Sequence, residues 1–160
     1  LNQGMQPIAG YNWGAHKNDR VWQVLFYTIS AATVVTTAGF LIGEFIPRIP
    51  SLIFTTDENI IALSSHGFRL CVSVFPLVGA QMVVSNFFQS IGHAGKSIFL
   101  STSRQLIFLI PGLLILPTFF GLDGVWYSLP LADALSCVIA ASMLWYTRKQ
   151  IIKKESSFKA

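Results

Sequence analysis

Four stretches of the chain are apolar over lengths that suit a membrane-spanning helix, which requires about 20 mainly apolar residues. They are residues 21–44, 67–91, 97–119 and 124–147. The first 14 residues are also mainly apolar and end in a polar, basic turn at residues 15–20, so they are expected to be the last part of a fifth crossing. The pattern predicts an all-α polytopic membrane protein with four complete transmembrane helices and the end of a fifth.

The segment between the first two windows contains signals that end one helix and start another. Pro47 and Pro50 stop the first helix, and Thr56-Asp57-Glu58 is typical of an N-cap followed by an acidic first turn. A helix that ran unbroken from this cap to residue 91 would be about 52 Å long, well beyond the thickness of the hydrocarbon layer. We therefore expect an amphipathic outer segment, a bend near Ser64-Ser65-His66-Gly67 and a kink at Pro76.

The composition agrees with a membrane protein. Hydrophobic residues make up 52% of the chain and charged residues 11%, whereas soluble domains contain about 25% charged residues. The mean hydropathy is +0.57. A soluble protein of this size has too little interior to bury so much apolar surface.

Lysine and arginine lie mainly on one side of the predicted membrane. Nine of them fall in the turns at 15–20 and 92–104 or after residue 147, and two, Arg48 and Arg69, fall on the other side. By the positive-inside rule the larger group is cytoplasmic. We expect a multi-pass inner-membrane protein with a cytoplasmic C-terminus, in which residues 148–160 form a basic cytoplasmic tail near anionic headgroups. Membrane lipids, and not nucleic acid, are the expected partners of this tail. The nine residues are Lys17, Arg20, Lys96, Arg104, Arg148, Lys149, Lys153, Lys154 and Lys159.

Asp133 is an acid near the middle of the last predicted span. It lies about ten residues inside the outer end of that span, at a depth of about 14 Å, where an acid costs at least about 2.5 kcal/mol. Pro130 withdraws a backbone donor just before it and leaves a carbonyl one turn earlier free. Asp133 is therefore a candidate proton or cation site, with Na⁺ as one candidate ion, or a counter-charge for a cationic substrate. The alternative is a buried acid that joins helices by hydrogen bonds.

A polar stripe runs along the second predicted span. Gln81, Ser85 and Gln89 recur every four residues, and Asn86 lies beside them. These side chains are candidates for lining a substrate pathway. The alternative is that they connect helices, since hydrogen bonds between membrane helices are worth about 0.6 kcal/mol each.

The sequence contains no motif that supports enzyme chemistry. Gly95-Lys96-Ser97 resembles the end of a phosphate-binding loop, but the first glycine of that motif is replaced by Ser90. The two cysteines, Cys71 and Cys137, fall inside predicted spans and are interpreted as small core residues. We therefore expect no catalytic residues, no cofactor and no dedicated metal centre.

The polar end of the first apolar run resembles the signature of the multidrug and toxic compound extrusion (MATE) family. The resemblance rests on Gln6-Pro7-Ile8-Ala9-Gly10-Tyr11-Asn12-Trp13-Gly14-Ala15, followed by Asn18-Asp19-Arg20. Phe87-Phe88-Gln89-Ser90-Ile91-Gly92 and Gly121-Leu122-Asp123-Gly124-Val125-Trp126 also resemble the second half of the family pattern, in the same order. The resemblance implies that Gln6, Pro7, Gly10, Tyr11, Asn12, Gly14 and Ala15 shape the cytoplasmic end of one helix.

The resemblance also implies an architecture. Transporters of this family have twelve helices in two bundles of six, which open a central cavity to each side in turn. The chain is then a fragment, residues 1–160, of the C-terminal bundle, with its first residue near the end of the eighth helix. Its partner would be the N-terminal half of the same transporter.

The function implied is secondary active efflux of amphipathic, often cationic, drugs or toxic organic compounds, by antiport with Na⁺ or H⁺. One alternative is a lipid-linked saccharide flippase of the same superfamily, which we expect to have a more cationic cavity than a chain without Lys or Arg deep in its spans. The other is a structural membrane subunit without cargo, in which Asp133 only joins helices.

Overall fold

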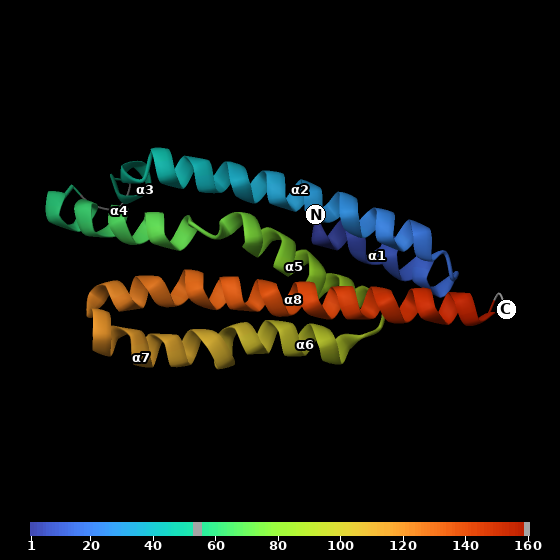
Figure 1. Ribbon diagram of the computed structural model, residues 1–160. Coiled ribbons are helices and arrows are strands. Elements are labelled where there is room, and N and C mark those ends of the chain that lie inside the picture. The colour runs from blue at the N-terminus through green and yellow to red at the C-terminus, as the bar shows by residue number, and fades with distance from the viewer. Residues whose placement is uncertain (53–55, 159–160) are drawn as a thin grey trace.

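The computed structural model describes residues 1–52 and 56–158, except for the side chains of residue 51 and residues 152–158, and all of its regular elements in this part of the chain are helices. Figure 1 shows long, nearly parallel rods joined by short turns. In chain order they are α1 (Asn2–Gly14), α2 (Asn18–Phe45), α3 (Arg48–Leu52), α4 (Glu58–Val72), α5 (Phe75–Ser90), α6 (Ala94–Thr102), the π-helical segment η1 (Ser103–Leu109), α7 (Ile110–Phe120) and α8 (Leu122–Phe158).

The helices match the predicted spans. α2, the continuous rod Ala94–Phe120 and residues Leu122–Ile151 of α8 are each long and apolar enough to cross a membrane. α4 and α5 meet the same test together, as one span bent by 50°. The predicted all-α polytopic class is confirmed, with up to four candidate spans and the shorter α1 in the described part of the chain.

The bend in the second span lies farther along the chain than predicted. α4 continues through Ser64-Ser65-His66-Gly67, and the hydroxyl of Ser64 donates back to the carbonyl of Ile60 at 2.6 Å without interrupting the helix. The break comes at Ser73 and Val74, immediately before Pro76 in the first turn of α5. Proline has no N–H to donate to the preceding turn, so the kink predicted at Pro76 is confirmed and the one near Gly67 is wrong.

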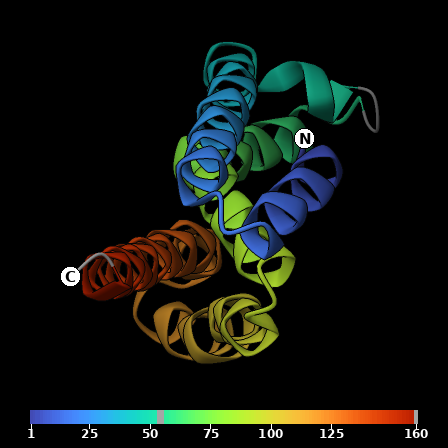
Figure 2. The same ribbon diagram turned by 90° about the vertical axis from the view of Figure 1, so that its right-hand side faces the viewer.

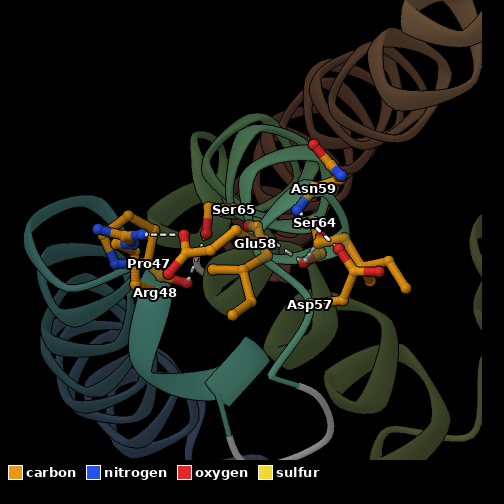
Figure 3. A network of polar contacts seen from close by, with 9 residues as sticks. Pro47, Arg48, Asp57, Glu58, Asn59, Ser64 and Ser65 are labelled. Carbon is orange, nitrogen blue, oxygen red and sulfur yellow. Dashed lines mark hydrogen bonds and ion pairs between the residues drawn. The ribbon is translucent and has the colours of Figure 1, made fainter.

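The start of α4 is fixed by a local polar network, shown in Figure 3. Asp57 is the N-cap and accepts the backbone N–H of Asn59 at 2.9 Å, as the sequence predicted. Arg48 of α3 pairs with Glu58 at 2.7 Å, which ties the short helix to the next one.

α5 is the central helix of the assembly. It contacts α1 and α2 on one side and α6 and α8 on the other, an arrangement seen end-on in Figure 2. Phe87 and Phe88 of α5 are fully buried in the core. Gly79 allows α2 to come close, since a Cβ there would lie 2.6 Å from the hydroxyl of Thr36.

The turns group at the two ends of the rods as the charge pattern requires. Figure 1 shows the turn between α1 and α2, the start of α6 and the end of α8 at one end, with α3 and the turn between α7 and α8 at the other. The basic turns thus share an end. Which end faces the cytoplasm stays a prediction.

Candidate functional site: a buried ion pair between η1 and α8

Asp133 lies within α8 with its side chain 10% exposed. It is the twelfth residue of the helix, about 17 Å from the helix start, which is about half of a 30 Å hydrocarbon layer. The predicted burial of an acid in the middle of an apolar rod is therefore found in the structure. A carboxylate in such a place requires a partner.

The partner is Arg104, a residue that the charge pattern assigned to a cytoplasmic turn. Its Nε donates to Oδ1 of Asp133 in an ion pair. Arg104 follows Ala94, the start of the rod, by ten residues, about 15 Å of helix. Both the assignment of Arg104 to a turn and the expectation that the spans contain no deep cation are therefore wrong. The window 97–119 already included Arg104, so the depth of this residue was visible in the sequence.

Arg104 is held in an irregular part of its helix. In η1 the backbone follows π-helical geometry, and the N–H of Ile110 donates to the carbonyl of Gln105, five residues earlier. Pro111 follows directly and cannot supply the N–H that an α-helix would offer to the carbonyl of Ile107. Such π segments are rare overall and occur often at functional sites.

A second buried polar contact lies one turn farther along α8. Gln81 of α5 is 4% exposed and donates from Nε2 to the hydroxyl of Ser136 at 3.1 Å. Ser136 follows Asp133 by three residues, so the two lie on neighbouring turns of one helix face. α8 thus presents an acid and a hydroxyl in succession, one bound to η1 and the other to α5.

The other members of the predicted stripe point to different neighbours. The hydroxyl of Ser85 lies 3.3 Å from the carbonyl of Ser97, on α6. Asn86 accepts a bond from Gln6 of α1 at 3.2 Å, and Gln89 is exposed. Gln81, Ser85 and Asn86 thus meet α8, α6 and α1 separately. The structure brings Gln81 to Ser136, one turn from Asp133, but does not bring the four side chains together.

Two of the signature residues, Gln6 and Gly10, hold α1 against α5. Besides the bond from Gln6, a Cβ at Gly10 would lie 3.1 Å from the carbonyl of Ser90, so the glycine allows close contact. Asn12 is buried and donates to the carbonyl of Ile8 at 2.8 Å. Pro7 lies inside α1, Tyr11 is 75% exposed, and Gly14 and Ala15 are at the exposed end of the helix.

The described residues contain no cluster of His, Cys, Asp or Glu suited to holding a metal ion. The carboxylate of Asp133 instead balances one guanidinium charge. A carboxylate at this depth is a candidate cation site, because a buried acid requires a positive charge beside it. Na⁺ near Asp133 stays a prediction.

Comparisons with known proteins agree with one another. The MatE family model matches residues 1–115. The multidrug export protein MepA of Staphylococcus aureus is 27% identical over 98% of this chain and 34% of its own length, and MepA of Staphylococcus haemolyticus is 24% identical with the same coverage. A solved structure of the MATE multidrug transporter DinF-BH is 37% identical, with a TM-score of 0.86 over 92% of this chain and 33% of that one.

The chain thus spans about a third of the length of these relatives. The family match covers the signature helix, the bent span and most of the rod that carries Arg104. With a matching family model and the same arrangement of helices as a solved MATE transporter, the chain belongs to the MATE family of transporters.

Proposed function

We propose that the chain is part of a secondary active exporter that expels amphipathic, often cationic, drugs and toxic organic compounds by antiport with Na⁺ or H⁺. It would form most of the C-terminal bundle, with the N-terminal half of the same transporter as its partner and alternating access as the mechanism. The similarity to a multidrug export protein and to a multidrug transporter supports this proposal.

The single observation that carries the proposal is the charged contact between Arg104 and Asp133 inside otherwise apolar rods. Ionisable groups at this depth are costly and usually mark the path of an ion or substrate. Asp133 is proposed as the residue that meets the coupling ion or the positive charge of the substrate. Gln81, Ser85, Asn86 and Gln89 are proposed to contact the substrate along its pathway once the bundles move.

The proposed setting is the inner membrane, with the C-terminus and the basic residues 148–160 in the cytoplasm. The excess of Lys and Arg at one end of the rods supports this orientation. The membrane setting is supported by the apolar surface of the helices and by the four tryptophans at the ends of the predicted spans, Trp13, Trp22, Trp126 and Trp145. Arg148 and Lys149 lie over the rings of Trp22 and Trp145, at 5.8 and 5.4 Å, in cation–π contacts at this end of the rods. Membrane lipids are the partners proposed for this end.

The flippase alternative gains an observation, because Arg104 puts a cation deep in a span. Its charge is neutralised by Asp133, however, so the pair adds no net positive charge for an anionic lipid-linked saccharide. We therefore favour export of cationic compounds. In the structural-subunit alternative, the ion pair would only hold η1 against α8.

The experiment that tests the proposal uses the full-length transporter in proteoliposomes, with a fluorescent organic cation and with Na⁺ and H⁺ gradients imposed separately. Efflux driven by either gradient is the expected result, and the gradient that works identifies the coupling ion. Movement of a lipid-linked saccharide without efflux of the cation would favour the flippase. If neither is transported, the structural-subunit alternative stands.

A further inference from the structure

The ion pair between Arg104 and Asp133 has the geometry of a contact that can be exchanged. Among the hydrogen bonds of the described residues, the guanidinium meets the carboxylate through Nε and Oδ1 alone. A bidentate pair, in which two N–H groups of the guanidinium donate to the two carboxylate oxygens, would be stronger and more rigid. The side chain of Arg104 is 29% exposed and that of Asp133 is 10% exposed, so the arginine lies on the more open side of the pair.

Asp133 needs a positive charge whether or not a ligand is bound. Cys71 of α4 is near enough to interact electrostatically with this carboxylate, but a thiol supplies no positive charge. The side-chain amide of Gln81 donates its hydrogen bond to Ser136 and carries no charge. If Arg104 moved away with nothing in its place, a bare carboxylate would be left in apolar surroundings, which is strongly unfavourable. A cation that enters the site can take that place.

The backbone at Arg104 provides a way for it to leave. Arg104 is the second residue of η1, and a π segment holds one more residue per turn than an α-helix. If η1 returned to α-helical geometry, α6 would rotate relative to α7 by about 100°, the angle of one residue in an α-helix. The rod is packed on both sides of η1, since η1 and α7 contact α8 and α6 contacts α5. Such a turn would therefore rearrange one of these contacts and move Arg104 relative to Asp133.

We propose that Arg104 is a built-in counter-cation for Asp133, which leaves the carboxylate when a monovalent cation binds there and displaces that cation again at release. The entering cation is either the coupling ion or the charged nitrogen of an organic substrate. Arg104 thereby limits the affinity of the site and promotes release. This inference rests on the proposed function, because it assigns a step of cation transport.

The test compares binding and transport of ethidium by the full-length transporter. In Arg104→Gln the competing charge is gone, so ethidium should bind about tenfold more tightly while gradient-driven efflux becomes slower, because release is no longer assisted. Arg104→Lys keeps a weaker competitor and should fall between this variant and the wild type. Asp133→Asn should lose both tight binding and efflux.

Two controls separate this role from a structural one. Arg69→Gln removes an exposed arginine of α4 and should leave binding and efflux unchanged. The double variant Arg104→Gln with Asp133→Asn removes both charges; it should fold and still fail to transport. Recovery of wild-type efflux by the double variant would show that the pair only joins helices and would overturn the inference.

The outcomes also separate the inference from the proposed function. If the wild type exports ethidium and Arg104→Gln binds it with unchanged affinity, the inference fails alone. If the wild type does not export a cation, the proposed function fails and the inference with it. Should Arg104→Gln not fold, Arg104→Lys decides, since wild-type affinity in that variant contradicts a competing role.

Discussion

The indole ring of Trp126, near the start of α8, lies directly against Gly67 of α4. A Cβ built on Gly67 would be 2.6 Å from Cε2 of the ring, closer than any real Cβ contact. The glycine therefore lets the outer part of the bent span pack on α8, where α4 and α8 are in contact. Residue 67 lies inside a regular helix, so its role is close approach rather than bending.

Gly67→Ala should destabilise the transporter, because the added methyl group overlaps the indole and forces the two helices apart. The expected loss is about 1–3 kcal/mol, as for other overpacked sites. Thermal melting of the purified full-length protein in detergent measures it. Gly95→Ala is the matched control: a Cβ there meets nothing within 4 Å, and alanine favours the helix by up to about 1 kcal/mol. Equal melting temperatures for the two variants would contradict the contact.

Removing one partner of the buried ion pair should be costly. Asp133→Asn leaves the Arg104 charge without its carboxylate, and a broken buried pair costs about 3–5 kcal/mol. The same melting experiment measures the loss. Glu58→Gln is the control, since it breaks the exposed pair with Arg48, whose side chains are 77% and 64% exposed, and should change stability by less than about 1 kcal/mol. A similar small loss in both variants would show that Asp133 is not buried with its partner.

The contact between Gln81 and Ser136 should contribute modestly. A double-mutant cycle with Gln81→Ala and Ser136→Ala is expected to give a coupling free energy of about 0.6 kcal/mol, typical of a hydrogen bond between membrane helices. The measurement is the stability of the two single variants and the double variant. Gln89→Ala serves as control because Gln89 is exposed, so it should not change stability. Strict additivity of the two single effects would mean that the bond is absent.

The two ends of the rods should be labelled from opposite sides of the membrane. With Cys71 and Cys137 replaced by alanine, Lys17→Cys should react with a membrane-impermeant maleimide only from the cytoplasmic side, and Leu122→Cys only from outside. Both positions are exposed, at opposite ends of the assembly. The physical reason is the excess of Lys and Arg around residue 17. Labelling of Lys17→Cys from outside would reverse the proposed orientation.

The sequence predicted where Asp133 lies in its helix, but it did not predict most of the side-chain contacts of the site. The depth of Asp133 followed from counting residues along one helix, and the kink at Pro76 followed from the missing N–H of proline. Arg104 was misplaced because charge was assigned to the nearest turn, although its position in the window 97–119 favoured a buried place. Gln81 is buried and Gln89 is exposed, although both lie on α5, because neighbouring helices cover the first position and not the second.

The sequence alone determined which segments are helices that suit a membrane, where the rods end and which family they resemble. These properties are local, because hydropathy, proline chemistry and short motifs are read along one segment at a time. Only the tertiary structure decided that Arg104 meets Asp133, that Gln81 meets Ser136 and that Gly67 lies under Trp126. Such pairs depend on the rotation of each helix about its own axis and on the irregular turn η1, and both are set by packing between segments that are distant in the chain.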